Sequence, residues 1–408
     1  MKVEEFRKFF PALEQEVYGK KLIYLDSAAT SQRSREVLSM LSTLSGRDNA
    51  NIHRSVYALA DKATAIYEET RDYVKEYINA ESREEIVFTS GTTFSINMVA
   101  YSYGDMVVKE GDNIIVSEAE HHSNLLPWQL LCKRKGAELR KLRVLDSGEL
   151  DVDSLESLID ERTKMLCVAH ISNVLGIINP IEKIVEIAHK KGVKVLVDGA
   201  QGAVHLGVDV RKLDCDFYAF SGHKLFAATG TGVLYAKREL LEIMQPFLSG
   251  GEMIGTVSFE SSTFAELPYK FEAGTPNFNA VPTLKPALEL LRFTMEDKEL
   301  KRNLESINEY VSEELNKDDR IHFAGEAVEN SRRIPLFSIM VDGVHHQDLA
   351  IIMDKMGVAL RSGHVCAEPL MNRLGVQGIL RASFASYNTM EEARDFIASL
   401  TRAIDLLH

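Results

Sequence analysis

The sequence predicts an α/β protein with a large domain on a mostly parallel sheet and a smaller α+β domain. At 408 residues the chain is too long for one compact core, and its 45% apolar residues suffice for two. Between residues 85 and about 237, strand patterns alternate with helical ones, which is typical of a parallel sheet covered by helices on both faces. After residues 271–277 the pattern changes to long helices at about 283–316, followed by strands mixed with helices.

The amino-terminal segment is predicted to be an arm that packs with the small domain. Residues 3–17 carry an amphipathic helical pattern, and residues 22–25 indicate a short strand. A long helix is expected over about 56–78, with Val56 and Leu59 on its apolar face. We place the arm at 1–20, the large domain at 21–270 and the small domain at 271–408.

Short apolar runs rich in β-branched residues define the expected strands. In the large domain these are Ile86–Thr89, Ile114–Ser117, Leu139–Leu145, Met165–His170, Val193–Val197, Phe217–Phe220 and Gly232–Ala236. In the small domain they are Pro335–Val341 and Ile379–Phe384.

Charge and hydropathy exclude several classes of partner. The formal net charge of -13 argues against a nucleic-acid or anionic-membrane surface. No apolar run approaches the roughly 18 to 20 residues that span a bilayer, and MKVEEFRKFF has no signal-peptide core. We therefore expect a cytoplasmic protein with no nucleic acid or membrane partner.

The four cysteines have no Cys-x-x-Cys spacing, so neither a disulfide framework nor a metal site is indicated. Cys132, Cys167 and Cys215 fit structural positions in or next to helices and strands. Cys366 differs, because RSGHVCAEP is a loop punctuated by Gly and Pro.

Asp198 and Lys224 end two consecutive strand patterns, where open α/β sheets bind their ligands. A lysine in this position can hold an aldehyde cofactor covalently, and an aspartate facing it is the usual partner of a pyridinium nitrogen. Together they indicate pyridoxal phosphate. Taken singly, Asp198 could instead cap a helix and Lys224 could be a solvated loop charge.

A phosphate site is predicted where residues 86–89 lead into Ser90-Gly91-Thr92-Thr93 and a helical run. Two hydroxyls and free backbone N–H groups then meet at a helix amino terminus. The alternative is a simple helix cap.

Asp-x-x-Gln from Asp198, followed by Ser-Gly-His-Lys at 221–224, resembles the fold-type I, class V aminotransferase-like family. The resemblance implies seven strands with one antiparallel. It also implies these cofactor contacts: Thr92, Thr93, Ser221 and His223 at the phosphate, His121 stacked on the ring and available for proton transfer, and Asn173 near the 3-oxygen with Gln201 beside it. His122 is expected to lie behind His121.

The segment Arg361-Ser362-Gly363-His364-Val365-Cys366-Ala367 resembles that of type II, SufS-like cysteine desulfurases, and the similarity extends over nearly the whole chain. It implies that Cys366 carries a persulfide, that Arg381 binds the substrate carboxylate, and that Arg361 and His364 help to bind substrate. L-cysteine would become L-alanine, and the sulfur would pass to an acceptor protein of a Suf-type iron–sulfur assembly system. The resemblance also implies a homodimer in which Thr275 of one subunit reaches the cofactor phosphate bound by the other.

Several alternatives remain open at this stage. The same residues fit a selenocysteine lyase or a cysteine sulfinate desulfinase, and less well a class V epimerase or aminotransferase. A scaffold or sulfur carrier that binds the cofactor without turnover is a third class. Val365 stands where many relatives have a second histidine, and Phe278 where smaller residues are frequent.

Overall fold

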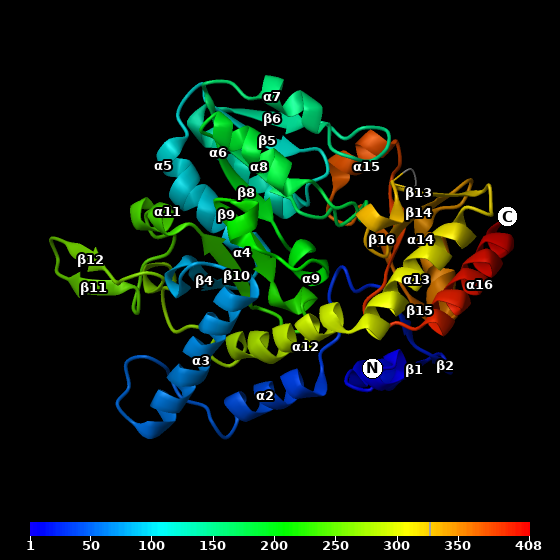
Figure 1. Ribbon diagram of the computed structural model, residues 1–408, viewed down its shortest axis with the longest axis horizontal. Coiled ribbons are helices and arrows are strands. Elements are labelled where there is room, and N and C mark those ends of the chain that lie inside the picture. The colour runs from blue at the N-terminus through cyan, green and yellow to red at the C-terminus, as the bar shows by residue number, and fades with distance from the viewer. Residues whose placement is uncertain (326–327) are drawn as a thin grey trace.

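The computed structural model describes residues 1–325 and 328–408, and two sheets organise it (Figure 1). One sheet has seven strands and the other four, with helices packed on both. The predicted α/β class with a smaller α+β part is confirmed. The boundaries predicted at residues 20 and 270 stay a prediction.

The seven-stranded sheet has the order β4-β10-β9-β8-β7-β5-β6. Only β10 runs antiparallel to its neighbours, so the arrangement implied by the family resemblance is confirmed. Its strands are β4 Ile86–Thr89, β5 Asn113–Ser117, β6 Glu138–Leu142, β7 Thr163–Ala169, β8 Lys194–Asp198, β9 Phe217–Ser221 and β10 Gly232–Ala236.

Both faces of this sheet are buried, as alternation along β9 shows. Tyr218 and Phe220 join one apolar cluster, whereas Phe217 and Ala219 join another on the opposite face. The covering helices include α3 Ala58–Tyr77, α4 Thr92–Val99, α6 Leu126–Lys135, α7 Leu155–Leu158, α8 Ile181–Lys190, α9 Gly202–His205, α10 Val210–Leu213 and α11 Arg238–Ile243. Six of the seven strands are therefore almost wholly buried, whereas the edge strand β6 is partly exposed.

The four-stranded antiparallel sheet has the order β13-β14-β17-β16, with bounds Ile321–Phe323, Leu336–Val341, Ile379–Ser383 and Arg361–Gly363. The helices packed with this sheet are α13 Lys298–Leu315, α14 His346–Lys355 and α16 Met390–Leu407. Helix α12 Leu284–Glu296 packs against α3 instead, and the buried residues of α12 and of α15 Glu368–Leu374 join the apolar cluster of the seven-stranded sheet. The helical stretch predicted at 283–316 divides at Asp297. The Asp297 carboxylate accepts the backbone N–H groups of Glu299 and Leu300 and so begins α13.

The predicted helix over residues 3–17 is wrong. Helix α1 covers only Val3–Arg7, and a turn of 3-10 helix at Pro11–Glu14 leads into β1 Glu16–Val17. Pro11 lacks a backbone N–H and holds Phe10 in an extended conformation, so the helix cannot continue. Strand β3, Ile23–Tyr24, pairs with β15, Val358–Ala359.

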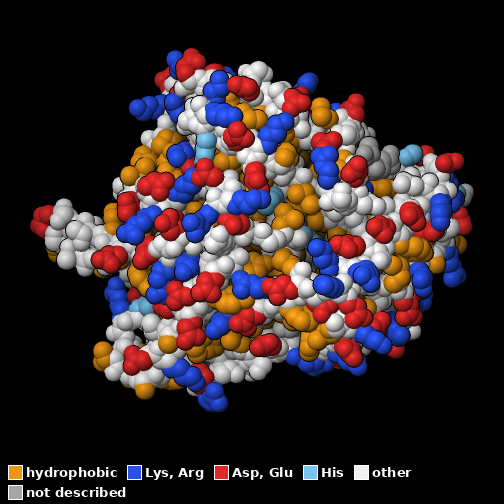
Figure 2. All heavy atoms as spheres, viewed as in Figure 1, with side chains coloured by type: hydrophobic (Ala, Val, Ile, Leu, Met, Phe, Trp, Pro, Cys, Tyr) orange, Lys and Arg blue, Asp and Glu red, His pale blue; other side chains and the backbone are white. Residues whose placement is uncertain are grey.

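Two further segments project from the left end of Figure 1. One is the chain before α3, and the other is the hairpin of β11 Ile254–Val257 and β12 Ser262–Phe264. Val56 lies in the chain before α3 and Leu59 in the first turn of α3. Both were expected on a buried helix face, and both are exposed. The visible face carries interspersed acidic and basic side chains (Figure 2). Of the helices in the described part of the chain, none has the length and hydropathy needed to span a membrane.

Candidate active site

A cavity of about 230 Å³ opens where the carboxyl ends of the parallel strands face β16 and β17. This is the place at which open α/β sheets bind ligands. Most of the predicted site residues line it: Thr92, Thr93, His121, Asn173, Asp198, Gln201, Ser221, His223, Lys224, Arg361, Cys366 and Arg381. Two of them, Thr275 and His364, do not line it and are exposed.

Asp198 and Lys224 both line the cavity, near enough for their charges to interact. Asp198 ends β8 and accepts the N–H of Ala200 at 2.9 Å through Oδ1. Burial raises its pKa, and nearby Lys224 opposes that rise. Burial also lowers the pKa of Lys224 to about 8, which the charge of Asp198 opposes in turn. A neutral amine is therefore accessible at this lysine near neutral pH.

One end of the cavity is formed by the amino terminus of α4. Gly91 precedes the helix at φ +146° and offers no side-chain cap. The Thr92 N–H donates to Ser221 Oγ at 2.8 Å, and Thr93 Oγ1 lies 2.7 Å from Ser123 Oγ. An uncapped helix terminus ringed by hydroxyl groups is suited to an anion such as phosphate.

His121 carries a neutral imidazole with a defined tautomer. Its Nδ1 accepts the Ser123 N–H at 3.1 Å, so the proton resides on Nε2. Burial lowers its pKa to about 3, and the charge of Lys224 lowers it further. The ring lines the cavity as an apolar face with one N–H donor.

The guanidinium of Arg381 is buried and largely fixed. It donates from Nη1 to the Asn173 carbonyl at 2.9 Å and from Nη2 to Asp26 Oδ1 at 3.2 Å. Its Nε has no hydrogen-bond partner among the described residues. Arg361, which is half exposed, lies 3.8 Å from the other oxygen of Asp26.

Cys366 lies on the exposed loop between β16 and α15. The loop is held from the large domain: Asn173 Nδ2 donates to the Val365 carbonyl at 2.9 Å, and the His122 N–H donates to the Cys366 carbonyl at 2.7 Å. The Asn173 amide nitrogen thus contacts the loop, while its predicted place near a cofactor 3-oxygen stays a prediction.

Two residues at the site had no predicted role. Asp26 binds Arg381, and Glu120, buried behind His121, accepts the Asn124 amide at 2.6 Å and the Ala169 N–H at 2.9 Å. Burial raises the pKa of Glu120 to about 8. Their place in the sequence could have indicated a role, because Asp26 and Glu120 each follow a short strand pattern.

Comparisons with known proteins agree with this arrangement. Residues 23–396 match the family described as aminotransferase class-V. This chain belongs to the class-V aminotransferase family. Within the family it groups with the cysteine desulfurases: a cysteine desulfurase of Salmonella agona is 44% identical over 99% of both chains. A probable cysteine desulfurase of Vibrio cholerae is 42% identical over the full length of both chains.

Solved structures give the same grouping. The cysteine desulfurase CsdA (S-sulfonic acid) from Escherichia coli is 40% identical over all of both chains, with a TM-score of 0.91. The apo cysteine desulfurase from Thermococcus onnurineus is 35% identical, with a TM-score of 0.90, over 97% of this chain and 98% of its own. Class-V aminotransferases of this group use pyridoxal phosphate.

The cavity fits that cofactor at three points. The uncapped terminus of α4 suits the phosphate, the buried carboxylate of Asp198 suits a protonated ring nitrogen, and the Lys224 amine suits the aldehyde. A cation against Asp198 would compensate the burial that raises the pKa of this carboxyl. Residues far apart in the chain therefore match the phosphate, the ring nitrogen and the aldehyde of pyridoxal phosphate.

Proposed function

We propose that the protein is a cysteine desulfurase that moves the sulfur of L-cysteine onto Cys366 and releases L-alanine. The observation that carries the proposal is that Cys366 lines the same cavity as Lys224 and Arg381, near enough for its charge to act on Lys224. The reaction of a class-V epimerase or aminotransferase does not require a thiol at this position, and a non-catalytic carrier does not require the lysine.

The residues divide the chemistry among them. Bound pyridoxal phosphate supplies an electron sink for charge developing at the substrate α-carbon. Asp198 keeps the ring nitrogen protonated, and Lys224 holds the cofactor and later moves the α-proton through Nζ. Arg381, which lines the cavity, binds the substrate carboxylate through its guanidinium.

Sulfur transfer falls to Cys366. Its thiolate attacks the substrate sulfur, so an S–S bond forms as the Cβ–S bond breaks. The electron pair of the broken bond passes to Cβ, which takes up a proton to give the methyl group of alanine. His121 would take part in this transfer as a relay that takes up a proton before it gives one, because the Nε2–H of a neutral imidazole is a hydrogen-bond donor and not an acid.

The remaining predicted residues position the cofactor. Thr92, Thr93, Ser221 and His223 would hold the phosphate, and burial lowers the pKa of His223 to about 4, so its imidazole is neutral. Asn173 and Gln201 would contact the ring, and Gln201 is fixed by donating to the Ala28 carbonyl at 2.9 Å. Arg361 assists at the carboxylate. His364 is exposed two residues before Cys366, and we propose that it helps to bind substrate from outside the cavity.

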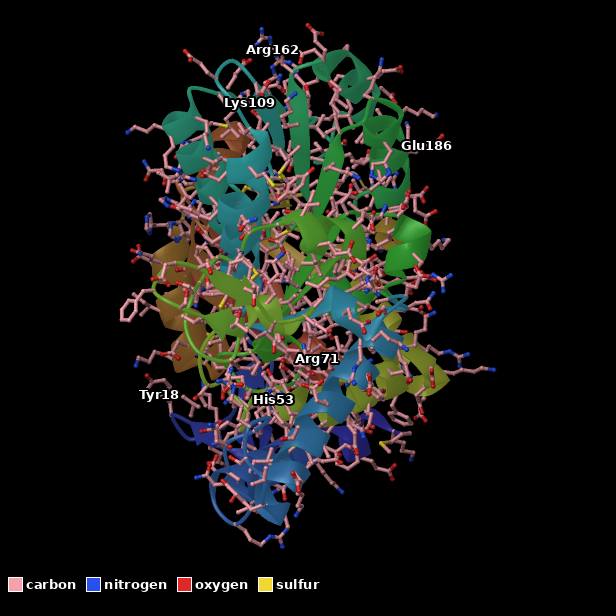
Figure 3. All side chains as sticks on the ribbon, turned by 90° about the vertical axis from the view of Figure 1, so that its left-hand side faces the viewer. Tyr18, His53, Arg71, Lys109, Arg162 and Glu186 are labelled. Atoms are coloured by element: carbon pink, nitrogen blue, oxygen red, sulfur yellow. The ribbon has the colours of Figure 1, made fainter. Side chains whose placement is uncertain are left out.

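The active form is proposed to be a homodimer. Two segments project from one end of the molecule, the end that faces the viewer in Figure 3 (Figures 1 and 3). They carry four exposed apolar side chains: Val56 and Tyr57 before α3, and Val257 and Phe259 on the hairpin of β11 and β12. Thr275 is exposed as well, which suits a residue that completes the phosphate site of a second subunit.

We further propose that the persulfide sulfur passes to an acceptor protein of a Suf-type iron–sulfur assembly system in the cytoplasm. The exposure of Cys366 supports delivery to another protein rather than release inside a closed cavity. The arm 1–20 and the domains 21–270 and 271–408 complete the proposed organisation.

The test is to incubate the purified, cofactor-loaded protein with L-cysteine and, separately, with L-selenocysteine. We expect alanine from cysteine together with a persulfide that maps to Cys366. Alanine and selenide from selenocysteine alone would assign a selenocysteine lyase instead. Sedimentation should give a dimer, and an active monomer at assay concentration would contradict the shared site.

A further inference from the structure

We propose that His122 is a positioning residue for sulfur transfer, which fastens the loop carrying Cys366 to the large domain. The cysteine loop is defined here as residues 364–368. The fastening is a property of the fold, whereas its effect on turnover rests on the proposed function.

His122 binds the cysteine loop at the thiol-bearing residue itself and two residues beyond it. Its backbone N–H donates to the Cys366 carbonyl at 2.7 Å, and its Nε2 accepts the Glu368 N–H at 3.1 Å. The loop also closes on itself, because the Ala367 N–H donates to the His364 carbonyl at 2.9 Å. His122 thus fixes the backbone within this turn, at Cys366, and just after it, at Glu368.

The loop needs such support because two consecutive residues in it are left-handed. Val365 has φ +44° and Cys366 has φ +59°. This region is unfavourable for non-glycine residues, and most of all for a β-branched one. Strained conformations of this kind persist only where contacts from the surroundings over-determine them. The hydrogen bonds from His122, together with the Asn173 amide on the Val365 carbonyl, are those contacts.

The tautomers of the two adjacent histidines separate their roles. His121 accepts through Nδ1, carries its proton on Nε2 and lines the cavity. His122 accepts through Nε2, so its proton is on Nδ1, and it is not part of the cavity wall. His122 therefore acts on the reaction through the position of Cys366.

Three substitutions at His122 provide matched variants. His122→Ala removes the acceptor and keeps the backbone N–H. In His122→Gln the carbonyl oxygen reaches about as far as Nε2 and can accept the Glu368 N–H, whereas in His122→Asn it is too short. We expect Ala and Asn to lower kcat for alanine formation by about 10- to 100-fold, since a displacement of about 1 Å has effects of this size. KM for cysteine and the cofactor absorbance should stay near the parent values, and Gln should restore most of kcat.

A second readout does not depend on activity. Amide hydrogen exchange over the cysteine loop should be faster in His122→Ala than in the parent holoenzyme and close to parental in His122→Gln, with β8 unchanged in both. Parental exchange in His122→Ala overturns the fastening, whatever the activity. Faster exchange with parental kcat overturns its role in sulfur transfer. A parent enzyme that forms no alanine refutes the proposed function, and exchange still decides the fastening.

A variant on the other partner covers the case in which His122→Ala fails to fold. Glu368→Pro removes the donated N–H and leaves His122 intact, and proline is well accepted at the first position of a helix. We expect faster alkylation of Cys366 by iodoacetamide and the same loss of kcat as in His122→Ala. Parental values for both would overturn the proposal.

Discussion

Arg381 and Asp26 form a buried ion pair, with Arg381 Nη2 and Asp26 Oδ1 3.2 Å apart. Burial lowers the pKa of Arg381 and raises that of Asp26, and each charge opposes the shift of the other. Nη1 donates to the Asn173 carbonyl, and Nε is buried without a hydrogen-bond partner among the described residues, so the protein does not use all the donors of this guanidinium.

Replacing Arg381 by Ala should raise KM for cysteine strongly while the cofactor still binds. Loss of one partner of a buried charge pair costs about 2 to 5 kcal/mol, or roughly 30- to several-thousand-fold in affinity. Arg361→Ala is the matched control. That side chain is half exposed, so we expect an effect below about tenfold. Steady-state kinetics on both variants decide the matter, and an unchanged KM in Arg381→Ala would remove Arg381 from the substrate site.

The rate of cofactor attachment to the apoprotein should rise with pH and level off above about pH 8. Attachment needs the neutral Lys224 amine, and burial lowers the pKa of Lys224 to about 8. A fall from 10.5 to about 8 raises the neutral fraction at pH 7 roughly 300-fold. Stopped-flow absorbance with pyridoxal phosphate between pH 6 and 10 measures this. A rate still rising steeply at pH 10 would be inconsistent with the buried environment of Lys224.

Glu120 should make the protein less stable as pH rises from about 5 to 8. Burial raises its pKa in the folded protein to about 8, so the folded state holds a proton that the unfolded chain has lost above its ordinary value of 4.5. Stability is therefore fully present below 4.5 and falls with rising pH, by at most about 1.4 kcal/mol per pH unit.

Glu120→Gln isolates this effect, because glutamine does not titrate. The variant loses an acceptor facing the Asn124 amide and should melt below the parent at pH 5. The difference in Tm between the two proteins should narrow toward pH 8. Calorimetry on the holoenzymes that gives a constant difference would argue against a protonated Glu120.

The sheet was predictable because its signal is local. Each large-domain strand is a short buried run, and the predicted bounds differ from the observed ones by at most a few residues, as in β8 and β9. The prediction of a helix over 3–17 is wrong for an equally local reason, because Pro11 interrupts the helical pattern. Residues whose roles are fixed by strand ends, such as Asp198 and Lys224, could be placed on the same grounds.

Long-range contacts could not be predicted in this way. Asp26 meets Arg381 across 355 residues, and His122 meets Glu368 across 246. Nearness in sequence also misled: His364 is two residues from Cys366, but the left-handed residues Val365 and Cys366 turn the chain and leave His364 outside the cavity. Backbone conformation at these two positions is set by tertiary contacts, which local residue patterns do not encode.

Cys366→Ala should separate substrate binding from sulfur transfer. In the proposed function Arg381 would bind the carboxylate of cysteine and the bound cofactor its amine, and neither contact would involve the thiol of Cys366. We therefore expect the variant to show the cofactor absorbance change on addition of L-cysteine, yet to form neither alanine nor persulfide in quantity. Cys366→Ser is the isosteric control and should behave in the same way, since a hydroxyl is a far weaker nucleophile toward sulfur.

Selenocysteine makes the outcome diagnostic. Selenium leaves carbon more readily than sulfur does, so its release can proceed without a thiol acceptor. Degradation of selenocysteine but not cysteine by Cys366→Ala would locate the defect in the sulfur-transfer step and leave the cofactor chemistry of Lys224 and Asp198 intact. Alanine formation from cysteine at the parent rate would exclude the persulfide mechanism. The class-V epimerase and aminotransferase activities would then have to be assayed directly.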